Sequence, residues 1–567
     1  MQRKRLFVTL LLISFIMSIS NLSAFASDID NSQNDNVQEG ELQSDDSELV
    51  YDDNSYLLGC KPDSEDFLRL YFRENNNIPD RATLPSSCDL SQDSYFPPIG
   101  DQGQVGSCTS WAATYYQFTY QVARLNNWNA KTNSNFRFSP RWTYNFCNGG
   151  INEGSSFEST YMILKNTGAA RWNDFIPSIY DTIAEYRNWS TDINLYRNAL
   201  KYRVSDLSVE KYETDMNILT PITSPNNSGL LTMKNYINSG HILTFSSKWN
   251  TPVYKTLSSQ YNSSLNGKKA IISFNNTNTT NSGHSLSIVG YDDNIWYDLN
   301  NNHHKENYEK GAFKVANSHN TTYQNDGYVW VMYDALNQRS NANNLNTSNR
   351  ESFIQRYTYY RIEVAEQDLD LTAEVTINHT HRNEIVLSTA DYMNNSVIQS
   401  FLNNSGGDYG FSGYNENSTA TFVFDYGELH ELNNVRRYVS LRIDDGYYSA
   451  GAITNVPTKV QRLKIIDKTG KIVVDDTDER IINNTVQSLN YKIGLVGDVD
   501  NDATVDITDA TRINNFIADL INFTNEDLLV SDTDADNSVT IMDVTHLQRY
   551  LVGIISNMNN GIYEFLG

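Results

Sequence analysis

A lone cysteine at the start of a helical segment has the surroundings that a nucleophilic thiol requires. Cys108 precedes a run of small and aromatic residues with helical spacing, and Gln102 lies six positions before it. The positive end of a helix dipole favours the thiolate form of a cysteine. A side-chain amide nearby can donate a hydrogen bond to the oxyanion that forms when a thiolate attacks a carbonyl. We therefore expect Cys108 to be a nucleophile and Gln102 an oxyanion donor.

Two later segments contain the residues that would activate such a thiol. His284 stands at the entry to an apolar strand, and Asn317 follows the end of another. An imidazole can take the thiol proton and form a thiolate–imidazolium pair. An amide oxygen on the other ring nitrogen fixes the orientation of the imidazole. A cysteine taken alone is more often a buried and inert residue, but these three residues together predict a catalytic site.

The motifs around these residues resemble those of the papain-like cysteine peptidases. The matching pieces are GDQGQVGSC with Cys108, GHSLSIVGYDD with His284, and FKVANS…NDGYVWV with Asn317, in the same order along the chain. A CNGG segment is similar to the one beside the substrate cleft of that family, which makes Gly149 and Gly150 candidate substrate-binding residues. The resemblance implies an α+β fold and hydrolysis of peptide bonds in protein or peptide substrates without a cofactor.

The chain departs from the family pattern at several positions. Val105 stands where the family usually has a cysteine bridged to the cysteine of CNGG, so Cys147 is either free or paired elsewhere, for example with Cys88. Thr109 replaces the aromatic residue that usually follows the nucleophile. His319 stands where the family often has the tryptophan that shields the histidine–asparagine hydrogen bond from water. These changes bear on efficiency and specificity, because the catalytic atoms remain.

The C-terminal region carries two copies of an acidic loop, each followed by an amphipathic helix. Calcium takes about six to eight oxygen ligands, and such a loop offers them at positions 1, 3, 5, 7, 9 and 12, with a backbone carbonyl at position 7. The candidate ligands are Asp498, Asp500, Asp502, Thr504, Asp506 and Asp509 in the first loop and Asp532, Asp534, Asp536, Ser538, Thr540 and Asp543 in the second.

The two loops, GDVDNDATVDITDA and SDTDADNSVTIMDV, resemble a dockerin. The resemblance implies two bound Ca²⁺ ions and a cohesin domain of a scaffoldin as partner, as in the cellulosomes of anaerobic plant-degrading bacteria. Position 6 of the loops, usually glycine, is Ala503 in one and Asn537 in the other. The positions that would recognise the cohesin are Ile507, Thr508, Ile541 and Met542.

The elements that must position these sites follow from hydrophobic periodicity. We expect a helix after Cys108 and a second helix over 157–166. Strands are expected over 285–291, 312–316 and 328–333, and alternating runs at 421–426, 438–443, 460–466 and 471–474 predict a β-sandwich. The segment 67–72 is compatible with either a short helix or a strand.

A chain of 567 residues is too long for one core. A basic start, an apolar run over 6–19 and an Ala-x-Ala site are typical of a secretory signal. We expect a multidomain protein with a signal peptide over 1–26, an acidic linker or propeptide over 27–80, a papain-like α+β peptidase over 81–362, an all-β sandwich-like accessory domain over 363–490 and a small all-α dockerin over 491–567.

The composition excludes some classes of partner. With 43 Lys and Arg against 68 Asp and Glu, the formal charge is −25, which argues against nucleic acid as a partner. No apolar run after the signal is long enough to span a membrane. The sequence therefore predicts a secreted, extracellular protein that is tethered to a cell-surface multienzyme complex through its dockerin.

Three alternative functions stay open at this point. The papain-like region is compatible with a catalytically weak or inactive binding component of the same assembly, or with a cysteine hydrolase of non-peptide acyl substrates. A glycoside hydrolase would need a pair of carboxylates in a persuasive setting, and we find none.

His303 and His304 could form a metal pair, but adjacent side chains in a polar loop are more often solvated surface.

Overall fold

The computed structural model describes residues 58–74, 84–180, 182–212, 222–249, 252–260, 263–274, 283–337, 352–391, 396–401, 406–416, 418–426, 437–446, 456–502, 504–558 and 561–567. The expected signal peptide lies outside the described residues, as do residue 503 and the first part of the acidic segment. Apart from Ser396, the elements below belong to one compact unit.

The first half of the peptidase-like region is helical. A continuous helix runs from Cys108 to Leu125 as α3 (Cys108–Ser110), a π-helical stretch η3 (Trp111–Phe118) and α4 (Thr119–Leu125). A capping box at Ser156 begins α6 (Phe157–Asn166), and Gly168 with φ of +64° follows its end. Both helices were expected from the sequence and are confirmed. The other helices here are η4 (Ser134–Phe136), α5 (Pro140–Cys147), α7 (Ile183–Tyr186) and α8 (Ile193–Ala199).

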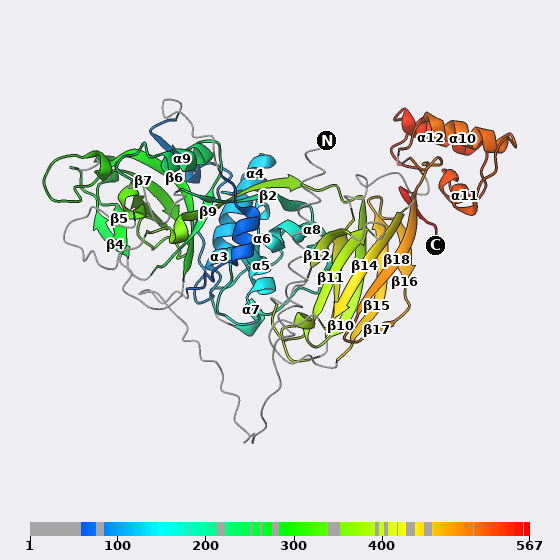
Figure 1. The fold of residues 1–567 in the computed structure, drawn as a ribbon, viewed down its shortest axis with the longest axis horizontal. Coiled ribbons are helices and arrows are strands. Elements are labelled where there is room, and N and C mark those ends of the chain that lie inside the picture. The colour runs from blue at the N-terminus through cyan, green and yellow to red at the C-terminus, as the bar shows by residue number, and fades with distance from the viewer. Residues whose placement is uncertain are drawn as a thin grey trace, which may run out of the picture. The chain divides into compact units, whose positions relative to one another are not determined.

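The second half is a largely antiparallel sheet with strand order β2-β9-β3-β6-β7-β8-β5-β4, and β1 pairs with β6 (Figure 1). The expected strands at the site are confirmed as β6 (His284–Trp296), β7 (Lys310–Ala316) and β8 (Tyr328–Met332). The other strands are β1 (Ser87–Asp89), β2 (Tyr202–Lys211), β3 (Leu243–Ser247), β4 (Pro252–Thr256), β5 (Lys269–Phe274) and β9 (Thr358–Glu366). Helical elements of this half are η2 (Leu90–Gln92), α9 (Ser228–Asn238), η5 (Ser263–Leu265), η6 (Asn307–Glu309), η7 (Tyr333–Leu336) and η9 (Gln355–Tyr357).

The accessory domain consists of two five-stranded antiparallel sheets, as the alternating pattern predicts. One sheet has the order β13-β10-β15-β16 with β17 beside β15, and the other has the order β12-β11-β14-β18-β19. Their bounds are β10 (Leu371–His379), β11 (Ile385–Asp391), β12 (Ser396–Phe401), β13 (Ser418–Asp425), β14 (Arg437–Asp445), β15 (Thr458–Asp467), β16 (Ile472–Asp476), β17 (Arg480–Ile482), β18 (Val486–Leu495) and β19 (Tyr563–Phe565), with η10 (Arg382–Glu384) before β11.

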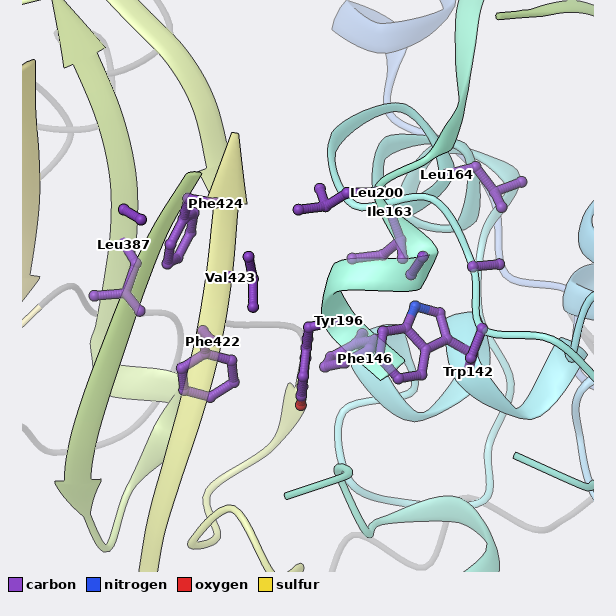
Figure 2. Packing of buried hydrophobic residues seen from close by; sticks show 14 of the residues in the cluster. Trp142, Phe146, Ile163, Leu164, Tyr196, Leu200, Leu387, Phe422, Val423 and Phe424 are labelled. Atoms are coloured by element: carbon purple, nitrogen blue, oxygen red, sulfur yellow. The ribbon is translucent and has the colours of Figure 1, made fainter. Parts of the chain in front are cut away.

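Aromatic side chains join the accessory domain to the helical half of the peptidase-like region. Tyr196 of α8 lies 5.4 Å from Phe422 of β13 between ring centroids, at 78°. Figure 2 shows Tyr196 between Phe146 on the helical side and Phe422 on the strand side. These residues belong to one buried apolar cluster that runs through both regions.

The C-terminal region has three short helices, α10 (Ile507–Ile517), α11 (Asn525–Ser531) and α12 (Ile541–Leu551), around a small apolar core that includes Ile513 and Leu547. The chain then returns to the sandwich, where β19 pairs with β18. The segment 67–72, ambiguous in sequence, is helical from Phe67 to Tyr71 within α2 (Glu65–Tyr71), and Phe72 forms a single β-bridge with Val209. Among the described residues, no helix has the length and apolar character needed to cross a membrane.

Candidate active site and calcium loops

His284 and Asn317 are brought together by neighbouring strands. His284 begins β6, Asn317 follows the last residue of β7, and the two strands pair with Ser287 opposite Ala316. His284 Nε2 donates to Asn317 Oδ1 at 2.7 Å, and both side chains are fully buried. The second ring nitrogen, Nδ1, is then the one that can exchange a proton with a thiol.

The Cys108 thiol lies near the start of β6, where Ser285 is the residue after His284. Backbone N–H groups of Ser285 and Gly59 can donate hydrogen bonds to its thiolate. Complete burial raises the pKa of Cys108, and these two N–H groups partly oppose that rise by stabilising the thiolate. The hydroxyl of Thr109 shares a hydrogen bond with that of Ser285 at 2.9 Å, which ties the start of the helix to the start of β6.

Aromatic rings cover the imidazole of His284. Trp249, two residues beyond β3, lies 5.0 Å from His284, and His319 lies 4.7 Å from it, both measured between ring centroids. Trp249 and His319 are buried. His319 therefore occupies the neighbourhood where the family often has its shielding tryptophan, and Trp249 adds a second ring that the motifs did not indicate.

Gln102 is also buried at the site, where it links the loop before Cys108 to the residue after Asn317. Its Oε1 accepts from Ser318 Oγ at 2.6 Å, and its Nε2 donates to the Val105 carbonyl at 3.0 Å. The oxyanion role of Gln102 stays a prediction.

Gly149 and Gly150 lie against residues of the accessory domain, since a Cβ atom on Gly407 would come within 2.2 Å of the Gly149 carbonyl oxygen. Gly150 is buried against the accessory domain, where a Cβ atom would come within 2.5 Å of the Tyr409 ring. The backbone of Ser155 pairs with that of Gly59 and Lys61. The substrate-binding role of the two glycines stays a prediction, and no sequence signal pointed to Ser155.

An extended piece of the chain's own N-terminal segment lies between Ser155 and Gly283. Cys60 exchanges backbone hydrogen bonds with Gly283, the residue before His284. On the opposite wall, Ser155 N–H donates to the Gly59 carbonyl at 2.8 Å, and Lys61 N–H donates to the Ser155 carbonyl at 3.0 Å. A Cβ atom on Gly59 would lie 2.0 Å from the Gly106 carbonyl oxygen, so this close approach requires glycine.

Residues after this piece anchor it. Asp63 accepts from the backbone N–H of Glu158 at 2.7 Å, and the hydroxyl of Tyr360 donates to the other carboxylate oxygen. Burial raises the pKa of Asp63 to about 6 despite these hydrogen bonds. Helix α2 then buries Phe67 and Tyr71 in the large apolar cluster.

All four cysteines carry free thiols in this structure. The Cys147 thiol donates to the Thr143 carbonyl at 3.0 Å and is not bridged to Cys88. Of the two states that the sequence allowed for Cys147, free or paired, the structure shows the free thiol. Val105 is buried at the position of the missing family cysteine.

The two acidic loops adopt one backbone arrangement. In the first, Asp502 N–H donates to the Asp498 carboxylate at 3.0 Å, and Asp506 N–H donates to Asp509 at 2.9 Å. The corresponding bonds of the second loop, from Asp536 to Asp532 and from Thr540 to Asp543, measure 3.1 and 2.8 Å. Carboxylate oxygens of Asp498, Asp500 and Asp509 lie within 4.8 Å of one another, as do those of Asp532, Asp534 and Asp536.

Residues 496–552 match the family model of the Dockerin type I domain. The C-terminal domain is a type I dockerin. Its loops fit calcium, since Asp500 Oδ1 at position 3 is buried and has no hydrogen-bond partner among the described residues. Asn537 takes the left-handed conformation at position 6 with φ of +67°, whereas Ala503 lies outside the described residues. In the dockerin, Asp506 and Thr540 also cap helices α10 and α12.

Solved structures similar to the chain include several cysteine proteases. Xylellain from Xylella fastidiosa is 18% identical, with 54% of this chain and 95% of that chain covered and a TM-score of 0.34. The cysteine protease and lectin-like domains of Cwp84 from Clostridium difficile are 14% identical, with 71% and 88% covered and a TM-score of 0.32. Bromelain from Ananas comosus is 14% identical, with 49% and 99% covered and a TM-score of 0.29. No curated protein sequence matches the chain.

Proposed function

We propose that this protein is a secreted cysteine endopeptidase that its dockerin fixes to a cohesin-bearing scaffoldin. The observation that carries the proposal is the buried hydrogen bond of 2.7 Å between His284 and Asn317, with Ser285, the residue after His284, placed to stabilise the thiolate of the buried Cys108. A thiol, an imidazole and an orienting amide in this arrangement serve nucleophilic acyl transfer.

The reaction follows from these three groups. His284 takes the thiol proton, and the Cys108 thiolate attacks the carbonyl carbon of a peptide bond. Gln102 and the backbone N–H of Cys108 are the candidate donors to the oxyanion. His284 then returns the proton to the leaving amine, and water hydrolyses the thioester so that the thiol is regenerated. Asn317 holds the imidazole in the orientation that both proton transfers need.

The walls of the cleft favour a peptide over other acyl substrates. Ser155 and Gly283 each use backbone N–H and C=O groups to pair with the extended segment at Gly59–Lys61. A peptide substrate presents the same donors and acceptors along its backbone, so it can replace the segment as an added strand. A small ester or amide would leave these buried polar groups unsatisfied.

The same geometry supports a role for residues 58–74 as an inhibitory propeptide. Gly59 of the segment lies at Cys108, which is fully buried, and burial favours its protonated thiol over the nucleophilic thiolate. Its anchors, Asp63 and the buried face of α2, lie on the peptidase domain. Removal or displacement of the segment would therefore free the backbone groups of Ser155 and Gly283 for a substrate.

Docking is a separate part of the proposal. At the cohesin-recognition positions, Ile507, Ile541 and Met542 are exposed by 61%, 56% and 58%. Large apolar side chains on a rim of charged residues are typical of a protein–protein interface. We infer that a cohesin with an apolar face binds here and holds the enzyme outside the cell in a multienzyme complex that degrades plant polysaccharides, with two Ca²⁺ ions ordering the dockerin.

N-terminal sequencing of the secreted protein tests the enzymatic part. We expect self-cleavage near Arg81–Leu84 in the parent protein, and its absence in Cys108→Ala or with a thiol-directed epoxide inhibitor. Cys88→Ala is the matched control, because that thiol is also free and lies outside the cleft.

Hydrolysis of an unfolded protein substrate by Cys108→Ala would overturn the assignment. A parent protein with its propeptide removed that labels with the epoxide but cleaves only esters would indicate a non-peptide acyl hydrolase. One that neither labels nor cleaves would be a binding component of the assembly.

A further inference from the structure

The loop between the two strands that carry His284 and Asn317 has the pattern of a calcium loop. It runs from Asp298 to Glu309 with the sequence DLNNNHHKENYE. Counted from Asp298, positions 1, 3, 5, 9 and 12 are Asp, Asn, Asn, Glu and Glu, which are the oxygen-bearing types of an EF-hand-type loop, and position 7 offers a backbone carbonyl.

Five hydrogen bonds of this loop recur at the same positions in the second dockerin loop. In both loops, the side-chain oxygens of position 1 accept the backbone N–H groups of positions 5 and 6 at 3.1 and 2.9 Å. The side-chain oxygen of position 5 accepts the N–H of position 7 at 2.8 Å in both. The carboxylate at position 12 accepts the N–H groups of positions 2 and 9, at 2.9 and 3.1 Å here and at 2.7 and 2.8 Å in the dockerin.

The backbone dihedral angles agree as well. Position 4 is left-handed in all three loops, with φ of +57° at Asn301, +64° at Asn501 and +64° at Ala535. Position 6 has φ of +62° at His303 and +67° at Asn537. The loop therefore shares its left-handed residues at positions 4 and 6 with the second dockerin loop.

The similarity to the dockerin loops is informative because those loops belong to a known domain family. They lie inside the segment that matches the Dockerin type I family model. The side chains also converge, since Asn302 and Asn300 donate to the two carboxylate oxygens of Glu306 at 2.7 and 3.3 Å.

Among the described residues, no lysine or arginine forms an ion pair with the carboxylates of this loop. Asp298 and Glu309 are 2% and 0% exposed, and Glu306 adds a third carboxylate beside them. Within the described residues, the only ion pair to these groups is from His303, at 3.4 Å to Asp298, and the side chain of His303 is 83% exposed. A bound cation relieves the repulsion among carboxylates that share one loop.

We propose that residues 298–309 form a third calcium site, located in the peptidase domain. Its ligands are the side chains of Asp298, Asn300, Asn302, Glu306 and Glu309 and the backbone carbonyl of His304. The two adjacent histidines are then not a transition-metal pair: His303 supplies the left-handed position 6, and His304 contributes only its carbonyl.

The site lies at one end of the hairpin whose other end holds the catalytic residues. Trp296 and Lys310 pair next to the loop, and the same two strands lead to His284 and Asn317. Calcium at this loop would fix the register of β6 against β7 and so hold the imidazole against its amide partner. This last consequence rests on the proposed peptidase activity, whereas the ion site does not.

Equilibrium dialysis of the full-length protein with radioactive Ca²⁺ tests the site. A variant with Asp509→Ala and Asp543→Ala disables both dockerin loops, and we expect it to retain one bound ion per chain. Addition of Glu309→Gln to that variant should abolish the remaining ion, whereas His304→Ala should leave it, because only the carbonyl of that residue binds.

Thermal unfolding gives a second readout that does not depend on activity. In the dockerin-disabled variant, saturating Ca²⁺ should raise the melting temperature of the peptidase domain by roughly 5–10 °C, and Glu309→Gln should remove the shift. A dockerin-disabled protein that binds no Ca²⁺ at about 1 mM and shows no shift would overturn the proposal, whether or not the protein cleaves peptides. The number of Ca²⁺ ions bound by the dockerin-disabled protein tests the proposed site even if the Glu309→Gln variant fails to fold.

Discussion

Replacement of Phe67 by alanine should open the active-site cleft. Phe67 is the buried contact of α2 near the segment that covers Cys108, with its ring 5.0 Å from that of Tyr71. Truncation of a buried phenylalanine costs about 3–5 kcal/mol, and we take about 3 because α2 lies at the surface. Each 1.36 kcal/mol is about a factor of ten, so the fraction of molecules with the segment undocked should rise about 100-fold.

Alkylation kinetics measure this opening. Iodoacetamide labelling followed by peptide mapping should show the Cys108 rate rising by up to about 100-fold in Phe67→Ala, together with that of Cys60, while Cys147 stays protected. Leu70→Ala is the matched control, because Leu70 lies on the exposed face of the same helix. An unchanged Cys108 rate would refute the docking argument, and equal labelling of all four thiols would show unfolding rather than undocking.

Three further predictions concern pH, catalysis and calcium. Because the pKa of Asp63 is about 6 in the docked segment and about 3.9 in a free one, docking should be strongest below about pH 4 and weaken as the pH rises through about 6. Proteolytic release of residues 58–74 should therefore be faster at about pH 7 than at about pH 5 in the parent, and Asp63→Asn, which keeps an acceptor for Glu158 N–H, should remove most of this difference. Asn317→Ala deletes a hydrogen bond to the catalytic imidazole, worth about 1.5–3 kcal/mol when that ring is charged, so kcat/KM should fall roughly 10- to 150-fold with little change in KM; an equal rise in KM would point to lost substrate binding instead. Asp500→Ala with Asp534→Ala should abolish capture by a cohesin in native gels while leaving the epoxide labelling of Cys108 intact, and retained capture would show that position 3 is not a ligand.

Local patterns in the sequence predicted most of the fold that positions the site. The capping residues of α6 and the apolar strands β6 and β7 are decided by neighbours along the chain, and the expected elements agree with the structure. The pairing of His284 with Asn317 followed from motif order, since each residue stands at the end of a strand that carries it to the same edge.

Contacts between distant segments were not readable in the same way. Trp249 reaches His284 only because β3 pairs with β6, with Ser247 opposite His284, and no local pattern marks that tryptophan. The path of Gly59–Lys61 through the cleft depends on backbone hydrogen bonds to Ser155 and Gly283, which leave no signature in side-chain types. The loop 298–309 escaped notice because asparagine replaces aspartate at positions 3 and 5 in a chain that is rich in asparagine.

The calcium loops differ in what holds them when the ion is absent, and this difference predicts their response to chelation. In the peptidase loop and in the dockerin alike, the carboxylate at position 12 already accepts N–H groups from positions 2 and 9, so part of the ordering cost is met before calcium binds. The peptidase loop is further tied down, because Glu309 also accepts from the Trp296 indole at 3.0 Å and the flanking strands belong to a large sheet. The dockerin has only a small apolar core to oppose the repulsion among its carboxylates. A chelator should therefore disorder the dockerin helices first, at a calcium concentration that leaves the peptidase domain folded with a lowered melting temperature, and circular dichroism followed by thermal unfolding would separate the two steps. Simultaneous loss of both domains at one calcium concentration would contradict this ordering.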